Sequence, residues 1–205
     1  MTHIMRYSLT ERIIHWIAGL TYLYELATGL AFYTPHLFWM AGILGGGPTS
    51  RYWHPIIGVV FLVAILRMFV MWSRDMRITD VDRRWAKEMG HYIRNEDELM
   101  PPAARFNVGQ KYFFWVMLWA GIFLLLSGLV LWFPEWIPWN LRWLRYTAIL
   151  LHEISALLSI GAFIIHVYMG TAMVRGGFTS IIRGEVSPEW AKLHHRLWYE
   201  KVSKE

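Results

Sequence analysis

The chain has 205 residues, of which 56% are hydrophobic and only 17% are charged, with a formal net charge of +5 and no cysteine. The apolar excess is too large for a soluble globular protein and indicates a membrane protein. Without thiolates, the chain cannot hold an iron–sulfur cluster, attach a c-type haem, form a disulfide or use a cysteine nucleophile. Histidine is therefore the strongest remaining ligand for a transition metal or haem.

Four long apolar runs define the predicted helices in chain order: 13–34, 53–73, 112–133 and 147–174. About 20 helical residues cross the hydrocarbon core, so each run is long enough to span a membrane. The charged residues inside the runs are Glu25, Arg67 and Glu153. We therefore expect an all-α membrane protein in which residues 1–205 form a single domain, a four-transmembrane-helix bundle with a tail at 175–205.

The basic residues predict the orientation of this bundle. Of the 20 Lys and Arg residues, 16 lie in the N-terminal tail, the 74–111 connection and the C-terminal tail, whereas three lie in the other two connections. The positive-inside rule then places both termini and the 74–111 connection in the cytoplasm. The net charge is thus a topology signal, and the long apolar runs leave no basic soluble face for nucleic acid.

The polar connections carry further predictions. Residues 74–111 mix acidic and basic side chains and contain Pro101–Pro102, which is typical of a partly helical surface segment. In the tail, Ser187 before Pro188 predicts a helix start with serine as the N-cap. A short amphipathic helix that carries the aromatic residues of 190–199 is expected to follow.

Four of the nine histidines lie within the apolar runs and divide by depth. His15 and His166 lie near the predicted cytoplasmic ends of their helices, and His54 and His152 lie near the external ends. The 14 residues from His152 to His166 correspond to a rise of about 21 Å and nearly four turns, so both rings leave the helix on nearly one face. Because an imidazole in hydrocarbon needs a partner, we predict two pairs, His15 with His166 and His54 with His152.

Two imidazoles that face each other across a bundle supply both axial ligands of a six-coordinate b-type haem. The pattern therefore predicts two haem b groups, one toward each membrane surface. Arg12 and Arg51 each precede a ligand by three residues, and Arg145 precedes His152 by seven, so these arginines are candidate partners for haem propionates. Glycines that would let a flat macrocycle approach the helices are Gly19, Gly29, Gly58, Gly121, Gly128 and Gly161.

An alternative from another class stays open at this point. In a haem-free membrane scaffold or small transporter, the histidines would make polar contacts between helices, the glycines would serve helix packing and the arginines would anchor the helices at the interface. A colourless purified protein would favour this alternative.

Longer motifs extend the pattern beyond the histidines. They are Arg12-x-x-His15-Trp16, Arg51-x-x-His54-Pro55-x-x-Gly58, Asn107-x-Gly109-Gln110-Lys111, Arg145-Tyr146 with His152, His166-x-Tyr168-Met169, and Trp190-Ala191-Lys192 with His194-His195. Over nearly the whole chain, this set resembles the cytochrome b556 (gamma) subunits of respiratory formate dehydrogenase. The histidine pattern alone is shared with the cytochrome b subunits of membrane-bound hydrogenases and thiosulfate reductases, which stay as alternatives.

The resemblance implies a complex of three subunits in the inner membrane of a bacterium. Whether that heterotrimer forms a higher oligomer stays open. A catalytic (alpha) subunit with Mo or W would oxidise formate, an iron–sulfur (beta) subunit would collect the electrons, and this chain would contain no formate-oxidising site. It would be the electron-transfer and quinone-reducing subunit in anaerobic respiration, passing electrons from the external haem to the cytoplasmic haem and then to menaquinone or ubiquinone. In the family, the quinone pocket uses a segment that here is Asn107, Gly109 and Gln110; the alternative for this segment is a helix-entry turn.

Overall fold

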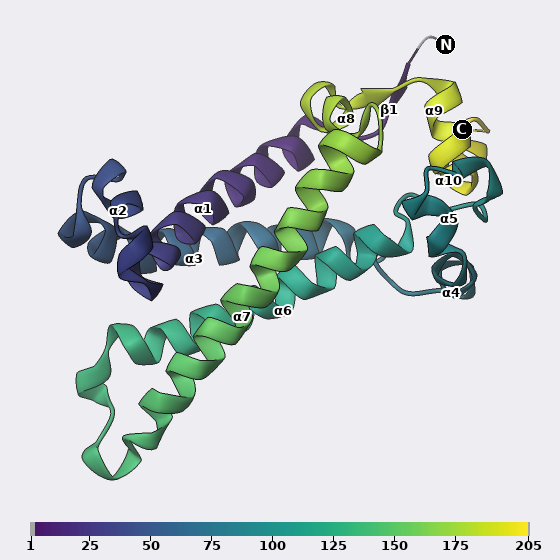
Figure 1. The fold of residues 1–205 in the computed structure, drawn as a ribbon. Helices are drawn as coiled ribbons and strands as arrows, with labels where there is room; N and C mark the ends of the chain where they lie inside the picture. The colour runs from purple at the N-terminus through teal and green to yellow at the C-terminus, as the bar shows by residue number, and fades with distance from the viewer. Residues whose placement is uncertain (1–2, 205) are drawn as a thin grey trace. The chain divides into compact units, whose positions relative to one another are not determined.

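The computed structural model describes residues 3–204, most of which are helical. Four helices of 25 or 26 residues dominate the fold (Figure 1): α1 (Leu9–Tyr33), α3 (Gly47–Trp72), α6 (Val108–Trp132) and α7 (Trp143–Tyr168). Each begins several residues before its predicted apolar run and ends close to it, because the runs were delimited by hydropathy whereas the first helical turns are partly polar. The predicted all-α class is confirmed, with one antiparallel pair of two-residue strands, β1 (Ile4–Met5) and β2 (Glu185–Val186).

Three helical segments in the described part of the chain are long and apolar enough to cross a membrane: Gly47–Trp72, Val108–Trp132 and Trp143–Met173. In the third segment, α7 continues into a π-helical turn at Met169–Met173. Large apolar side chains such as Leu126 and Leu158 are more than half exposed on these helices, as expected for surfaces that face lipid. α1 has the same length but a lower hydropathy, since polar residues such as Glu25 lie within it.

The described chain divides into two compact units. Unit 2 comprises residues 13–69 and 116–162, which hold the greater part of the four long helices together with α2 (Trp39–Ile43). Unit 1 comprises the residues up to 12, 70–115 and the residues from 163 onward. Its short helices are α4 (Asp80–Lys87), α5 (Met89–Ile93), α8 (Gly177–Arg183), α9 (Pro188–His194) and α10 (Arg196–Val202). Single 3-10 turns are Pro35–Leu37, Asp97–Leu99, Pro134–Trp136 and Trp139–Leu141.

Unit 2 contains a polar contact between two of its long helices. The hydroxyl of Ser159 donates to the carbonyl of Ala156 at 2.8 Å, so its oxygen accepts from the Tyr22 hydroxyl at 2.9 Å. The Tyr22 ring also packs against Phe61, with ring centroids 5.5 Å apart. A buried tyrosine hydroxyl normally requires such a partner, and this one joins α1 to α7.

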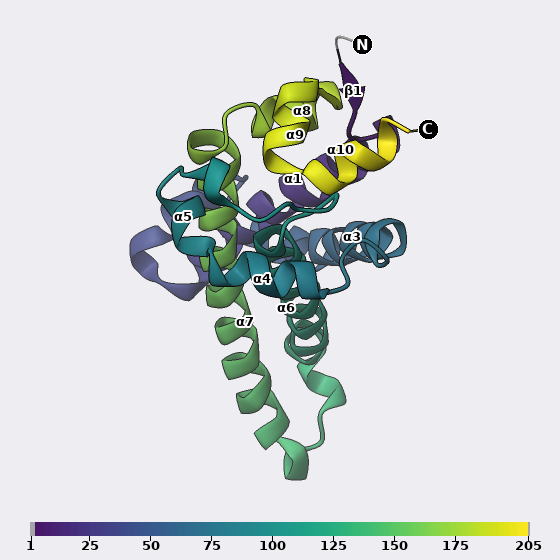
Figure 2. The ribbon, with the colours of Figure 1, turned by 90° about the vertical axis from the view of Figure 1, so that its right-hand side faces the viewer.

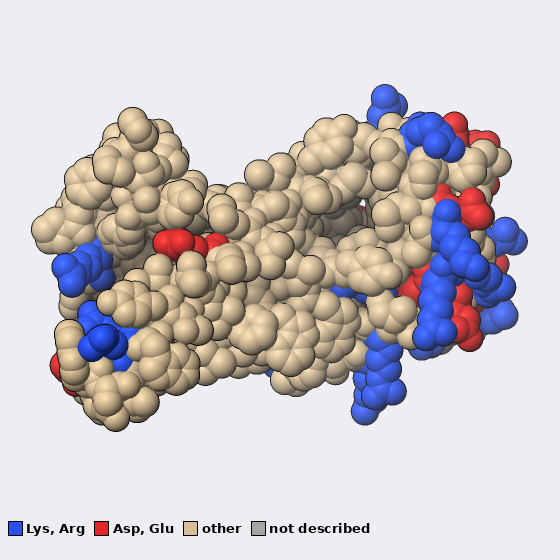
Figure 3. Space-filling view, turned by 60° about the horizontal axis from the view of Figure 1, so that its bottom comes forward, with Lys and Arg blue, Asp and Glu red and all other residues tan. Residues whose placement is uncertain are grey.

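Unit 1 gathers most of the charged residues. Figure 3 shows Lys, Arg, Asp and Glu side chains most densely over the part of the view that holds α4, α5, α9 and α10, and Figure 2 shows α8, α9 and α10 close to β1. The 74–111 connection is partly helical, as predicted, through α4 and α5. In α4, the side chains of Thr79 and Asp82 form a capping box, and Asp82 also pairs with the buried ammonium of Lys111 at 2.7 Å.

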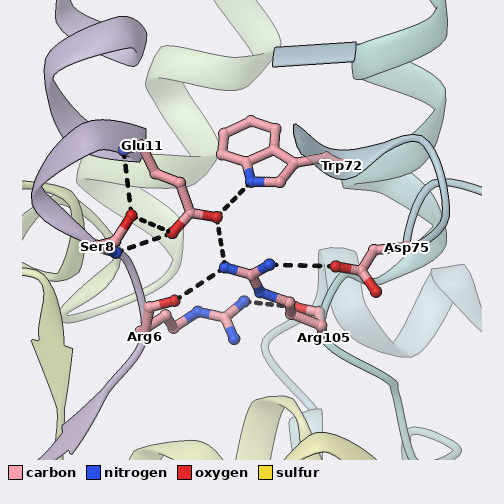
Figure 4. Close-up of polar contacts among 6 residues, drawn as sticks. All are labelled: Arg6, Ser8, Glu11, Trp72, Asp75 and Arg105. Carbon is pink, nitrogen blue, oxygen red and sulfur yellow. Dashed lines mark hydrogen bonds and ion pairs between the residues drawn. The ribbon is translucent and has the colours of Figure 1, made fainter. Parts of the chain in front are cut away.

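A polar network in unit 1 joins segments that are distant in sequence (Figure 4). The Glu11 carboxylate accepts from the Trp72 indole at 2.5 Å and from the Arg105 guanidinium at 2.6 Å, and it also accepts from Ser8. Arg105 donates a further hydrogen bond to Asp75 at 3.1 Å. A buried carboxylate is tolerated when it is paired and hydrogen-bonded in this way. The network therefore fixes the start of α1 to the end of α3 and to the connection before α6.

The tail contains two short helices, so the prediction of one amphipathic helix was wrong. The predicted helix start is confirmed, since the Ser187 hydroxyl accepts from the Trp190 amide as the N-cap of α9. The chain breaks at His195, whose backbone leaves the helical region at φ −144° and ψ 52°. The reason is a tertiary one: the His195 ring is buried and bonds to Arg6 at 3.0 Å and to the Ala104 carbonyl at 2.8 Å.

Candidate functional site

Two of the four predicted ligands, His54 and His152, lie together in unit 2. The centroids of their rings are 6.3 Å apart, and the ring planes meet at 58°. His54 belongs to α3 and His152 to α7, and the side chain of His54 is 21% exposed. Two helices that are far apart in sequence thus bring one imidazole each to a common point inside the unit.

The other two long helices contribute one hydroxyl each to these rings. Thr28 of α1 lies 2.7 Å from Nδ1 of His54, and Ser127 of α6 lies 2.9 Å from Nδ1 of His152. Each hydroxyl donates its single proton to the backbone carbonyl four residues earlier, at 2.8 Å and 2.6 Å. Because that proton is used, each hydroxyl oxygen must accept a hydrogen bond from Nδ1–H. This fixes the tautomer of both rings and leaves the lone pair on Nε2.

This arrangement fits a haem iron. Neutral imidazole with a free Nε2 lone pair is the ligand form, and a hydrogen bond from the other ring nitrogen is the usual support for it. Because metal–nitrogen bonds are about 2.0 Å long, two imidazoles with ring centroids 6.3 Å apart leave room for one metal ion that both would hold.

Two of the predicted glycines lie against the same rings. A Cβ at Gly29 would lie 3.8 Å from Cε1 of His54, and a Cβ at Gly128 would lie 3.4 Å from Cε1 of His152. A Cβ at either position would therefore be in van der Waals contact with an imidazole edge. Gly121 serves ordinary packing instead, because a Cβ there would meet side chains of α3 at 3.4 and 3.5 Å.

The second predicted pair falls in different units. His15 lies in unit 2, where its ring meets that of Trp16 edge-on with centroids 5.7 Å apart. His166 lies in unit 1, where its ring stacks on Phe113 with centroids 4.1 Å apart and planes 4° from parallel. The pairing of His15 with His166 stays a prediction.

The predicted propionate partners have different surroundings. Arg12 donates to the carbonyl of Ile182, which ties the start of α1 to α8 in unit 1. Arg51 and Arg145 are exposed. That Arg12, Arg51 and Arg145 bind haem propionates stays a prediction.

The segment predicted to bind quinone forms a reciprocal cap at the start of α6. The side-chain oxygen of Asn107 accepts from the Gln110 amide, and that of Gln110 accepts from the Asn107 amide, both at 3.0 Å. Gly109 lies inside this turn, with the Asn107 oxygen 3.4 Å from the position of a Cβ. This is the helix-entry turn considered as the alternative. Quinone binding by the segment stays a prediction.

Three residues near the imidazoles were not assigned a site role from sequence. Thr28 and Ser127 are hydroxyl residues in apolar runs, near the predicted external depth of the two histidines, and that depth was the signal that could have found them. Glu25 was noted as a charge inside the first run but had no assigned partner. In the structure its carboxylate lies 3.1 Å from Nδ1 of His54.

Comparisons with known proteins extend over almost the whole chain. A family model described as prokaryotic cytochrome b561 matches residues 6–184. The chain is 33% identical to the formate dehydrogenase cytochrome b556(fdo) subunit of Escherichia coli K12, over 98% of this chain and 94% of the relative. It is 30% identical to the formate dehydrogenase cytochrome b556 subunit of Haemophilus influenzae, over 98% of this chain and 84% of that relative. It is 28% identical to the nitrate-inducible formate dehydrogenase cytochrome b556(Fdn) subunit of E. coli K12, over 98% of this chain and 92% of that relative.

Proposed function

The chain belongs to the prokaryotic cytochrome b561 family, and we propose that it is the cytochrome b subunit of a formate dehydrogenase, the anchor that conducts electrons within the membrane. The observation that carries the proposal is the pair of imidazoles at 6.3 Å, each held with its Nε2 lone pair available. Full-length similarity to relatives named as formate dehydrogenase cytochrome b556 subunits supports the choice of partner over a hydrogenase or thiosulfate reductase.

Haem b is the cofactor that the family implies. His54 and His152 would hold one group toward the external surface, and His15 with His166 would hold a second toward the cytoplasm. A haem with two axial imidazoles exchanges single electrons without offering an open coordination site. The chain itself fixes the tautomers of the two imidazoles through the hydroxyls of Thr28 and Ser127. Its apolar helices would keep water away from the haem.

The proposal includes α1 as the fourth span. Glu25 and the tyrosines of α1 lower its hydropathy, but polar side chains that face other helices rather than lipid are compatible with a membrane span. Four spans place both termini on the same side, and the distribution of Lys and Arg supports the cytoplasmic side.

Partners and quinone follow from the same proposal. An iron–sulfur subunit would deliver electrons to the external haem, after a molybdenum or tungsten subunit has oxidised formate. Quinone would be reduced at the cytoplasmic side, near the start of α6, where an amide side chain and a backbone N–H of the segment with Asn107, Gly109 and Gln110 are suitable hydrogen-bond donors to a quinone carbonyl. Identification of the subunits that purify with the chain tests the assignment of the complex.

The replacement His152→Ala tests the conduit role. It should remove one of two b haems per chain, measured by the pyridine haemochrome assay against protein concentration, because one axial ligand is lost. Quinone reduction by formate should then fall to background, whereas formate oxidation with an artificial dye should survive, because the dye accepts electrons from the other subunits.

Two outcomes would contradict the proposal. Purified wild-type protein without haem would remove its basis and favour the haem-free scaffold or transporter. Loss of the dye reaction in an assembled complex that lacks the His152 ligand would mean that the chain takes part in formate oxidation itself.

A further inference from the structure

Glu25 is a carboxylate placed against a ligand histidine inside unit 2. One of its oxygens, Oε2, lies 3.1 Å from Nδ1 of His54, and its side chain is only 16% exposed. The same oxygen lies 3.3 Å from the position that a Cβ would take at Gly58, so the glycine of α3 leaves room for the carboxylate. Its second oxygen, Oε1, is buried without a hydrogen-bond partner in the described structure.

A buried carboxylate is costly unless it is paired. Among the described residues, the basic side chain within 4 Å of the Glu25 carboxylate is the imidazole of His54, which is neutral as a metal ligand, and not a Lys or Arg side chain. The buried position of the Glu25 carboxylate is therefore best explained by an interaction with the imidazole of His54.

The two ligand histidines differ in this respect. Nδ1 of His54 has the Thr28 hydroxyl at 2.7 Å as its hydrogen-bond partner, and an oxygen of Glu25 also lies 3.1 Å away. The ring of His152 has the Ser127 hydroxyl at 2.9 Å and a backbone hydrogen bond with Leu124, without a carboxylate of the described residues in contact. The acidic residue next to His152 in sequence, Glu153, is exposed. The carboxylate thus distinguishes one axial imidazole from the other.

We propose that Glu25 is a positioning residue that shares the Nδ1 proton of His54 with Thr28, and that it lowers the reduction potential of the haem bound there. The inference rests on the proposed function. A carboxylate that accepts from the second ring nitrogen increases the electron donation of the imidazole to its metal. When ionised, the carboxylate also places a negative charge near the ring, which stabilises the oxidised iron over the reduced iron. Both effects act in the same direction on the potential.

The consequence concerns the direction of electron transfer. A lower potential at the haem of His54 makes transfer onward, to the haem at His15 and His166, more favourable. Electrons that enter on the external side would thus be driven inward across the membrane.

The test is a redox titration of the complete complex, followed through the haem α-band, with Glu25→Gln. The amide is nearly isosteric but uncharged, and it is a weaker acceptor. We expect the midpoint potential of one haem to rise, with a change of about tenfold in its reduction equilibrium constant, which is about 59 mV for one electron. The potential of the other haem should stay at its wild-type value.

The matched control is Glu153→Gln. It removes the same charge from the same unit, beside the other ligand in sequence, but from an exposed side chain. Its titration should show a much smaller rise than Glu25→Gln, because solvent screens the charge of an exposed side chain. Equal shifts in both variants would assign the effect to long-range charge and overturn the positioning role.

A second variant guards against loss of haem in Glu25→Gln. Glu25→Asp keeps the charge but withdraws the carboxylate by one carbon–carbon bond, about 1.5 Å. The midpoint potential of that haem in Glu25→Asp should lie between its values in the wild type and in Glu25→Gln. Unchanged potentials in the haem-loaded aspartate variant would overturn the proposal.

A spectroscopic readout separates this inference from the function on which it rests. The wild-type complex should give the low-spin ferric electron paramagnetic resonance signals of haems with two axial imidazoles, and their absence would contradict the proposed function. If these signals are present but Glu25→Gln leaves both potentials unchanged, only the role of Glu25 is wrong.

Discussion

At the scale of single residues, hydroxyl groups decide which nitrogen of each imidazole is available. Ser127 has one proton, which goes to a backbone carbonyl at 2.6 Å, so its oxygen accepts from His152. Thr28 repeats this arrangement on His54. Such supporting groups fix both the orientation and the tautomer of a metal ligand.

Replacement of Ser127 by alanine should therefore weaken haem retention. Nδ1–H of His152 would lose its hydroxyl acceptor, and a buried polar group whose hydrogen bond is lost costs up to about 1–3 kcal/mol. The loss of an outer partner typically lowers metal affinity by about 10–100-fold. Haem content after extended washing of the purified complex measures this effect. Ser159→Ala is the control, because it removes a hydrogen bond to Tyr22 instead, and equal haem loss in both variants would contradict the specific role.

At the scale of elements, the tail of unit 1 is held by a buried histidine. His195 accepts from Arg6 through Nε2 and donates to the Ala104 carbonyl through Nδ1, so the folded ring is neutral. Burial lowers the pKa of His195 well below its ordinary value of 6.5, and the charge of Arg6 lowers it further. Burial also lowers the pKa of the neighbouring His194, although Asp97 acts in the opposite direction.

This arrangement predicts an acid-sensitive tail. A histidine whose pKa is lower in the folded state stabilises the fold above its unfolded pKa, and that contribution is lost as the pH falls below about 6.5. Limited proteolysis should therefore cut the α9–α10 region faster at pH 5.5 than at pH 7.5. His195→Gln should be less stable at pH 7.5 but should show a smaller change between the two pH values. A wild-type tail that is equally protected at both would contradict the prediction.

At the scale of the whole molecule, the number of spans and the side of the termini are linked. An even number of spans returns the chain to the side from which it started, and the basic residues predict that this side is the cytoplasm. Within residues 3–204, three helical segments are apolar enough to span a membrane by composition alone. Whether the number of spans is odd or even therefore depends on α1.

Reporter fusions test this link. A green fluorescent protein fused to either terminus should fluoresce, and an alkaline phosphatase fused there should be inactive, because both termini are expected in the cytoplasm. A phosphatase inserted between Pro134 and Leu141 should be active. Termini on opposite sides would mean an odd number of spans and would remove α1 from the membrane.

Much of the fold follows from local sequence. Hydropathy and run length predict α3, α6 and α7 to within several residues, because a helix in lipid must satisfy its backbone internally and present apolar side chains. Ser187 and Pro188 predict the start of α9 because capping depends on near neighbours in the chain. The break at His195 could not be predicted, because it depends on Arg6 and Ala104, which are distant in sequence.

The sequence by itself determined what the chain can hold: with no cysteine and with four histidines in apolar runs, imidazole ligation is the available redox chemistry. Only the tertiary structure decided how the site is supported. Thr28 and Ser127 fix the ring tautomers, and Glu25 distinguishes His54 from His152. The physical reason is the sequence distance over which each property acts. Hydropathy and residue spacing belong to one segment, whereas a hydrogen bond between two helices depends on the rotation and packing of both helices.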